Sequence, residues 1–324
     1  MKLLLRADAS PTIGAGHISR VVAYAERAVA RGWDVHFAGC TTNAEWLAAR
    51  FDELSVPRLP VSSFADLVSG FDAVLVDHYG IGDVRAEANA AGARLVSIED
   101  DVFGRRPADV VVDSGFAPGP RPEDGSGLLL RGVEYTPLRD VVLRARSRRS
   151  TSSPLQVTVV LGGGAEWAST VSLLLQALAD TGLPFAADAL VRGTPTLPST
   201  VEGQVIRVAA PHAGLLDLLA GTDVAISASG VTFLELCCLG VPTAAVQLVD
   251  NQAAGYRAAL ERGLARGLGS ADTLGARLPE VTETLRQLLS DASLRSRLAA
   301  AGRSAVDGRG VDRVLDALTS DFSR

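Results

Sequence analysis

Short apolar runs alternate with segments of helical period along most of this chain. Runs such as 3–5, 73–76 and 110–112 are continuously apolar, which is typical of strands buried on both faces. Apolar residues at helical spacing separate these runs, for example over 20–31 and 84–91. This order of elements predicts an α/β fold in which helices cover both faces of parallel sheets.

A polar segment rich in Ser and Arg interrupts the alternation at 144–154. The alternation then resumes at 157–161, and the last strand is expected at 243–246, with helices beyond it. A length of 324 residues suits two domains of roughly 150 residues each. We therefore expect a first domain at 1–145, a linker at 146–154, a second domain at 155–310 and a C-terminal helix at 311–324 that can pack back on the first domain.

Composition narrows the class of partner. The chain is 47% hydrophobic and 21% charged, with a net charge of −6, which disfavours nucleic acid and membrane surfaces as partners. It shows neither the pattern of a signal peptide nor an apolar run of roughly 18 residues, so we expect a cytoplasmic protein without a membrane span. Cys40, Cys237 and Cys238 are too few for a disulfide framework or zinc cage, and we expect them reduced and buried.

A glycine-rich turn follows the first strand. Gly14 and Gly16 let backbone N–H groups approach a ligand without an intervening Cβ. His17 stands at the mouth of a helix expected to start at 19–21, where Arg20 lies, and a histidine can move a proton near neutral pH. The turn therefore predicts a reaction centre for an anionic substrate.

Polar residues also stand where other strands end. Asp8 follows the first strand, and Asp77, His78 and Tyr79 close another. Ligands of open α/β sheets bind beyond the carboxyl ends of the strands, so these residues are candidates for the site. A buried acid that caps a loop is the alternative. The acids at 99–101 could suggest a metal, but a solvated turn explains them better, and no metal site is expected.

The second half opens with its own glycine turn, which includes Gly162 and Gly163. A tight loop between a strand and a helix explains such a turn equally well. Neither turn of the chain matches the dinucleotide fingerprint with its following acid, and neither carries the Gly-Lys-Ser/Thr of a P-loop. Both observations disfavour a dehydrogenase and an ATP-hydrolysing enzyme.

A richer cluster follows the apolar run at 224–226. Small and hydroxyl residues at a helix N-terminus suit a pyrophosphate, and here they are Ser229, Gly230 and Thr232. Glu235, expected in the first turn, could accept hydrogen bonds from the two hydroxyls of a ribose or simply favour the helix dipole. Asn251 and Gln252 are expected to open another helix, where amides bind sugar hydroxyls or act as caps.

Four blocks together resemble a known family. The segments 6–20, 76–80, 129–139 and 228–242, the last with Asn251 and Gln252, are similar to the signature blocks of the UDP-sugar hydrolase of pseudaminic acid biosynthesis. That family is related to the N-acetylglucosaminyltransferase that makes lipid II. The resemblance implies the GT-B fold, in which two Rossmann-like domains place their parallel sheets on either side of a cleft.

The resemblance also implies a mechanism. UDP would bind at 229–235, and His17, together with Asp8, would activate water to attack the anomeric carbon of an acetamido or deoxy sugar with inversion. No metal and no cofactor is expected, and the protein is expected to be a monomer or a weak homodimer. The partner would be a nucleotide sugar, with UDP as its nucleotide.

The chain departs from the family at 100–105, 113–115 and Phe233, where tryptophan is common. These changes leave the sugar open. An inverting glycosyltransferase of cell-surface glycan or specialised-metabolite biosynthesis is the main alternative. A 2-epimerase and a non-catalytic protein that binds nucleotide sugars are the others.

Overall fold

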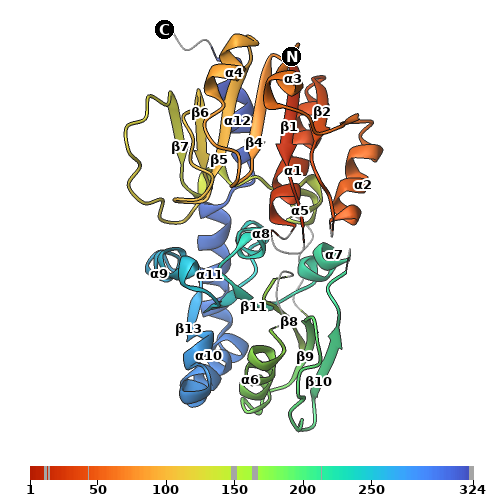
Figure 1. Cartoon of the computed structure of the whole chain (residues 1–324). Helices are drawn as coiled ribbons and strands as arrows, with labels where there is room; N and C mark the ends of the chain where they lie inside the picture. The colour runs from red at the N-terminus through yellow and green to blue at the C-terminus, as the bar shows by residue number, and fades with distance from the viewer. Residues whose placement is uncertain are drawn as a thin grey trace. The chain divides into compact units, whose positions relative to one another are not determined.

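The chain forms two compact units (Figure 1). The computed structural model describes residues 1–10, 13, 15–42, 44–146, 152–162, 167–212 and 214–320, without the side chain of Asn251. The first unit comprises Met1–Asp140 and Gly308–Arg324, and the second comprises Val141–Asp307. The chain enters the second unit at the start of helix α5 (Asp140–Ala145) and returns to the first after Asp307.

The first unit is built on a parallel sheet in the order β3-β2-β1-β4-β5-β6-β7. Its strands are β1 (Lys2–Ala7), β2 (Asp34–Ala38), β3 (Arg58–Leu59), β4 (Ala73–Asp77), β5 (Arg94–Glu99), β6 (Val110–Asp113) and β7 (Leu128–Arg131). Its helices are α1 (Gly16–Ala30), α2 (Glu45–Glu53), α3 (Phe64–Val68), α4 (Arg85–Ala90), η1 (Val133–Tyr135) and α12 (Gly310–Thr319).

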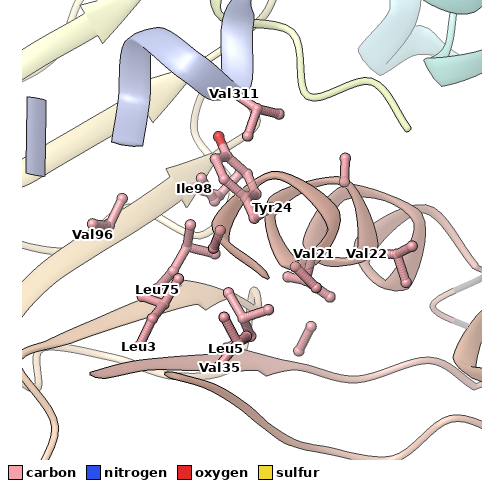
Figure 2. Close-up of a cluster of buried hydrophobic side chains, with 14 of the residues drawn as sticks. Leu3, Leu5, Val21, Val22, Tyr24, Val35, Leu75, Val96, Ile98 and Val311 are labelled. Atoms are coloured by element: carbon pink, nitrogen blue, oxygen red, sulfur yellow. The ribbon is translucent and has the colours of Figure 1, made fainter. Parts of the chain in front are cut away.

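Both faces of this sheet are buried. Leu75 of β4 packs with side chains of α1 and α12 on one face, while its neighbours Val74 and Val76 pack toward α3 and α4 on the other. Figure 2 shows Tyr24 of α1 in the first of these clusters, beside Ile98 and Val311. Burial on both faces explains why the strands read as continuous apolar runs, as the parallel-sheet prediction requires.

The C-terminal helix α12 completes the first unit. Its residues Val311, Val314, Leu315 and Leu318 are buried in the same cluster as α1. Polar contacts reinforce the packing, since Arg27 Nη2 donates to Asp312 Oδ2 at 2.5 Å. The core of the first unit therefore depends on a helix that follows the whole second unit in sequence.

The second unit repeats the architecture with six parallel strands in the order β10-β9-β8-β11-β12-β13. They are β8 (Leu155–Val160), β9 (Phe185–Leu190), β10 (Gln204–Ala209), β11 (Val224–Ala228), β12 (Thr243–Gln247) and β13 (Arg266–Ser270). The helices are α6 (Ala168–Ala179), α7 (Leu215–Ala220), α8 (Val231–Leu239), η2 (Asp250–Gln252), α9 (Ala253–Glu261), η3 (Ala271–Thr273), η4 (Gly275–Arg277), α10 (Leu278–Ser290) and α11 (Ala292–Ala305).

Some expectations from the sequence were wrong. A strand, β13, follows the one expected to be last, and it escaped notice because its sequence, RGLGS, holds a single apolar residue. The α1 helix begins at Gly16 rather than near residue 19, so His17 lies inside its first turn. Cys40 is exposed, whereas Cys237 and Cys238 are buried.

No helix in the described part of the chain has the length and apolar character needed to cross a bilayer.

Candidate active site

The expected catalytic histidine is paired with a buried acid. His17 Nδ1 lies 2.5 Å from Oδ1 of Asp77, the last residue of β4, and both side chains are buried. Burial opposes ionisation of Asp77, but the Arg20 charge and the hydrogen bonds from His17 and Arg20 hold the pKa of Asp77 below its usual value. An ionised carboxylate only accepts hydrogen bonds, so we assign the proton of the neutral ring to Nδ1. Nε2 then keeps the lone pair that a general base needs.

Arg20 fixes the position of that acid. It lies three residues after His17, so the two side chains share one face of α1. Its Nε and Nη2 donate to the two Asp77 oxygens at 2.7 Å each, and Nη1 donates to both oxygens of Asp100 at 2.8 Å each. Arg20 was predicted to bind substrate. Because its guanidinium is buried and bonded to two carboxylates, the geometry favours a role in positioning Asp77 instead.

Asp100 extends the cluster toward solvent. It follows β5, and the Tyr79 hydroxyl donates to its Oδ2. Burial and the charge of Asp100 raise the pKa of Tyr79, so its hydroxyl keeps its proton and remains a donor. The ring of Tyr79 stands edge-on to the imidazole of His17, with centroids 4.5 Å apart.

The contacts of this cluster suit a base. Asp77 bonds to Nδ1 and Arg20 holds Asp77 in place, so the ring presents Nε2 in a fixed orientation. The arrangement can therefore accept a proton from a hydroxyl or from water while that group attacks a substrate.

Asp8, the second expected catalytic residue, has a different environment. Arg6 Nη1 and Nη2 donate to its two oxygens at 2.5 and 3.0 Å, and the Cys40 N–H donates to Oδ1 at 2.8 Å. Burial opposes the effect, but these bonds and the Arg6 charge lower the pKa of Asp8 to about 2. So weak a base takes up protons poorly near neutral pH, and the geometry favours a positioning role for Asp8.

A glycine makes this contact possible. A Cβ on Gly39 would lie 1.7 Å from the Ala7 carbonyl oxygen, so only glycine lets the chain after β2 come so close to the end of β1. The Cys40 N–H thereby reaches Asp8, which ties the carboxyl ends of the two strands together.

His78 links the same acid to β4. The Gly80 N–H donates to His78 Nδ1 at 2.9 Å, so the ring proton is on Nε2, which lies 2.9 Å from Asp8 Oδ2. Burial lowers the pKa of His78, which keeps the ring neutral. Both nitrogens are thus bonded within the protein, although His78 was predicted to bind substrate.

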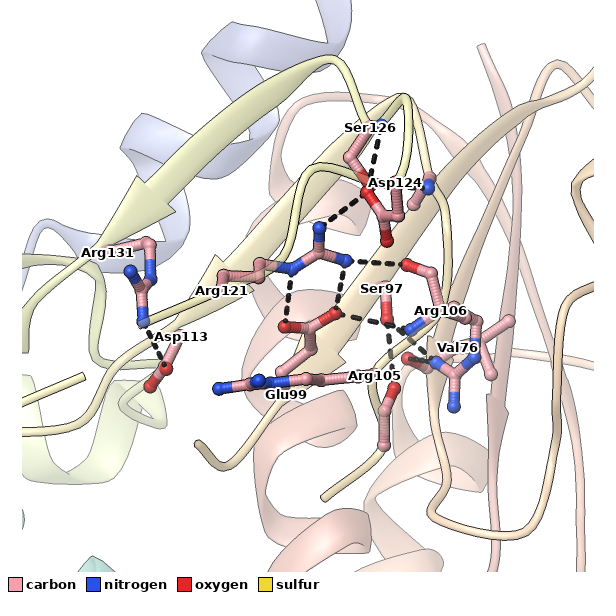
Figure 3. A network of polar contacts seen from close by, with 12 residues as sticks. Val76, Ser97, Glu99, Arg105, Arg106, Asp113, Arg121, Asp124, Ser126 and Arg131 are labelled. Atoms are coloured by element: carbon pink, nitrogen blue, oxygen red, sulfur yellow. Dashed lines mark hydrogen bonds and ion pairs between the residues drawn. The ribbon is translucent and has the colours of Figure 1, made fainter. Parts of the chain in front are cut away.

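A buried ionic network supports the loop after β4 (Figure 3). Arg106 Nε donates to the Ile81 carbonyl at 3.1 Å, and its Nη2 donates to the His78 carbonyl. Arg121 donates to both oxygens of Glu99 at 2.9 and 3.0 Å. Among the described residues, no group of three metal-ligating side chains could hold a metal ion. The acids at 99–101 are engaged with arginines and Tyr79 instead.

The second unit offers a different kind of site at the carboxyl end of its sheet. Helix α8 starts after Gly230 with no side-chain cap and no acid in its first turn. Ser229 Oγ is buried and has no hydrogen-bond partner within the part of the chain that the structure describes. A Cβ on Gly230 would touch nothing within 4 Å. A helix N-terminus without a side-chain cap, a hydroxyl and open space suit an anion.

The other predicted binding residues are placed less uniformly. Glu235 lies in the second turn of α8 rather than the first and is buried. Gln252 does not cap α9, and its Oε1 accepts a hydrogen bond from the Leu248 N–H at 3.0 Å. Thr232 is half-buried in the first turn of α8. Gly16 and Gly162 have open space around a Cβ position. Gly14, Gly163 and the side chain of Asn251 lie outside the described residues.

Sequence reasoning missed Asp100 as a partner of Arg20. Asp100 follows β5 and Asp77 ends β4, and these two strands are neighbours, with Val76 opposite Ser97. The signal was the order of strands in the sheet, which places the two carboxyl ends side by side.

Comparisons with known proteins agree on the fold. No protein-family model matches the chain. The spore coat polysaccharide biosynthesis protein SpsG of Bacillus subtilis (strain 168) is 34% identical over 99 residues, which is 30% of this chain and 28% of that protein. The solved structure of MurG of Acinetobacter baumannii has a TM-score of 0.65 at 16% identity, covering 98% of this chain and 99% of its own. Spinosyn forosaminyltransferase SpnP also has a TM-score of 0.65, at 17% identity and 99% and 100% coverage.

These likenesses span nearly the whole chain and show that it has the GT-B fold, with one parallel-sheet α/β unit in each half. The fold expected from the sequence is confirmed. The match to the curated relative covers less than a third of either protein, so the reaction has to be argued from the geometry of the site.

Proposed function

We propose that this protein is a glycosyltransferase that moves a sugar from a nucleoside diphosphate sugar to a hydroxyl group of an acceptor. The observation that carries the proposal is the pairing of His17 Nδ1 with the ionised Asp77, which Arg20 holds in place. The GT-B fold and the likeness to a forosaminyltransferase support transfer to an acceptor rather than the hydrolysis that the sequence resemblance implied.

The proposed reaction is a single displacement. His17 Nε2 takes the proton of the acceptor hydroxyl while its oxygen attacks the anomeric carbon. The bond from that carbon to the diphosphate breaks, and the diphosphate leaves with the electron pair. Asp77 stabilises the resulting imidazolium, as a carboxylate does in catalytic triads. One base and one displacement invert the anomeric centre.

The second unit has the groups to hold the leaving diphosphate. The uncapped N-terminus of α8 and the hydroxyl of Ser229, which has no partner among the described residues, suit a negatively charged group, because both donate hydrogen bonds. Glu235, further along α8, is the proposed partner of the ribose, and UDP is the proposed nucleotide. Asn251 and Gln252 stay candidates for sugar hydroxyls.

The test is a panel of UDP-, dTDP- and CMP-sugars with the full chain, each with and without hydroxyl acceptors. Nucleotide release is measured by chromatography, and the anomeric configuration of the product by proton NMR coupling constants. We expect nucleoside diphosphate release that requires an acceptor, and a product of inverted configuration.

Two results would contradict the proposal. Free sugar formed at full rate without any acceptor would assign the hydrolase instead, with water at the same base. A product of retained configuration would exclude a single displacement at His17. The donor panel also covers the alternative that the chain only binds nucleotide sugars, since that would give binding without release.

A further inference from the structure

Beside the proposed base lies a patch of exposed apolar side chains, which we call the aromatic platform: Tyr79, Val102 and Phe103. They are 47%, 58% and 45% exposed, although each is a large hydrophobic residue. The rings of Tyr79 and Phe103 are 5.6 Å apart between centroids, and Tyr79 also touches His17. The platform is therefore continuous with the imidazole that the proposed function uses.

The loop that carries Val102 and Phe103 is built to hold them outward. The N–H groups of Asp100 and Phe103 each donate to the other residue's carbonyl at 3.0 Å, which closes a tight turn. Asp101 adopts a left-handed φ of 54° inside that turn. Its carbonyl accepts from Arg105 Nε at 2.6 Å. Exposure of these two apolar side chains thus follows from a defined conformation, at the cost of a strained residue.

Gly104 lets the turn pack closely against Tyr79. It has a φ of 74°, and a Cβ there would lie 3.2 Å from the Ile98 carbonyl oxygen and 3.3 Å from Tyr79 Cδ1. The loop therefore packs directly on the ring of Tyr79, and the three apolar residues form one preformed surface.

The platform offers almost no polar group to a ligand. Val102 and Phe103 have no polar side-chain atoms, and the Tyr79 hydroxyl is already bonded to Asp100. A hydroxyl-rich sugar or a diphosphate would gain no hydrogen bond from the side chain of Val102 or Phe103 and would lose water. An apolar or aromatic ring would instead bury carbon against carbon, in the edge or stacked arrangements that aromatic rings favour.

We infer that the aromatic platform binds the acceptor and that the acceptor is a hydroxyl compound with an apolar or aromatic ring. The inference rests on the proposed function, because an acceptor on the platform can react only if the neighbouring His17 acts as the base. It makes Phe103 a residue that determines specificity, while Tyr79 contributes its ring to the acceptor and its hydroxyl to Asp100.

The experiment measures binding and turnover separately on the full chain. Binding of 4-methylumbelliferone, a fluorescent aromatic hydroxyl compound, is followed by saturation-transfer NMR and titration, with methyl α-glucoside as the polar counterpart. We expect the first to bind and the second not to. We expect Phe103→Ala to raise the Kd of 4-methylumbelliferone about 5- to 30-fold, the loss of one good ring contact.

Control variants separate the platform from general effects. Val61→Ala removes an equally exposed apolar side chain elsewhere in the first unit and should leave the Kd unchanged. Tyr79→Phe keeps the ring but not the hydroxyl and should also bind the probe normally. In turnover with an aromatic acceptor, Phe103→Ala should raise the KM for the acceptor and leave the Kd for UDP or dTDP unchanged.

The outcomes of the two proposals are distinguishable. Binding that depends on Phe103, without nucleotide release from any donor, would keep the platform and contradict the proposed function. Turnover whose acceptor KM is the same in Phe103→Ala would keep the proposed function and overturn the platform. Failure of the wild-type chain to bind the aromatic probe, or equal binding of methyl α-glucoside, would also overturn it.

Discussion

The two sheets end in contrasting chemistry at their carboxyl edges. In the first unit the ends of β4 and β5 and the start of α1 carry charged side chains that bond to one another: Asp77, Asp100, His17 and Arg20. In the second unit the comparable position at α8 carries small residues, an uncapped helix start and the unpartnered hydroxyl of Ser229. One fold, used twice, thus presents a cluster of mutually bonded charged side chains once and a helix start without a side-chain cap once.

The contrast reflects the different hydrogen bonding that a base and an anion site require. A base must be oriented, and orientation requires bonded neighbours such as Asp77 and Arg20. An anion site must leave its donors unbonded until the ligand arrives. Saturated and unsaturated hydrogen bonding therefore distinguishes the proposed catalytic edge from the proposed binding edge.

The largest expected effect tests that division directly. Replacing His17→Gln removes the base and keeps a side chain of similar size, so turnover should fall about 10²- to 10⁴-fold. Nucleotide affinity, measured by calorimetry, should stay the same because α8 is untouched. His36→Gln is the control and should leave turnover unchanged, because His36 lies on β2 and pairs with Asp34 at 3.0 Å. A nucleotide affinity that falls as far as the turnover in His17→Gln would contradict the proposed division of roles.

The second prediction concerns the bonded acid Asp8. Its folded pKa of about 2 lies below the ordinary 3.8, so its contribution to stability is present above about pH 4 and is lost as the pH falls toward 2. Asp8→Asn should lower the free energy of unfolding by about 2 kcal/mol at pH 7, and this deficit should shrink in acid. Urea titrations at several pH values measure it. Asp272→Asn, at an exposed acid, is the control and should leave the free energy of unfolding at pH 7 nearly unchanged.

The third prediction addresses the unbonded edge. Ser229→Ala deletes a hydroxyl without a partner in the described structure, so the fold should keep its stability. The Kd for UDP or dTDP should rise about tenfold if that hydroxyl donates to the diphosphate. Ser227→Ala is the control and should leave the nucleotide Kd unchanged, because the Ser227 hydroxyl already donates to the Ala228 carbonyl at 3.2 Å. An unchanged Kd in Ser229→Ala would remove the serine from the anion site.

The smallest effect sharpens the role of Asp100. Asp100→Asn removes the charged acceptor of Arg20 Nη1 and of the Tyr79 hydroxyl, so Arg20 holds Asp77 less firmly. The turnover number should therefore fall about 2- to 5-fold, while the Kd for UDP or dTDP stays the same. An unchanged turnover number would show that Asp100 does not support Arg20 and Asp77.

Sequence reasoning reached the elements of this molecule more readily than its side-chain pairings. The buried strands β4 and β6 were predictable because burial on both faces produces uninterrupted apolar runs. Strand β13 was not, because glycine and arginine dominate it. His17 was predicted as the base from its neighbours in sequence, whereas its bond to Asp77 spans 60 positions.

Asp8 and His78 show the same limit from the other side. Their positions at strand ends were correctly read as part of the polar edge, but residue type alone could not reveal that each bonds the other. Which polar groups remain available to a ligand depends on strand order and on local loops, and neither can be read from a single sequence.

Helix α12 also constrains the order in which the two units can complete their folding during synthesis. The first unit contains residues 1–140 but lacks the buried side chains of Val311, Val314, Leu315 and Leu318 until α12 has been synthesised. Each fully buried aliphatic side chain contributes about 1.5–3 kcal/mol, so the nascent first unit emerges from the ribosome with an open hydrophobic groove. The second unit has its last described strand by residue 270 and its last core helix, α11, by residue 305, before α12 begins. The second unit begins later in the sequence than the first unit but is completed before it.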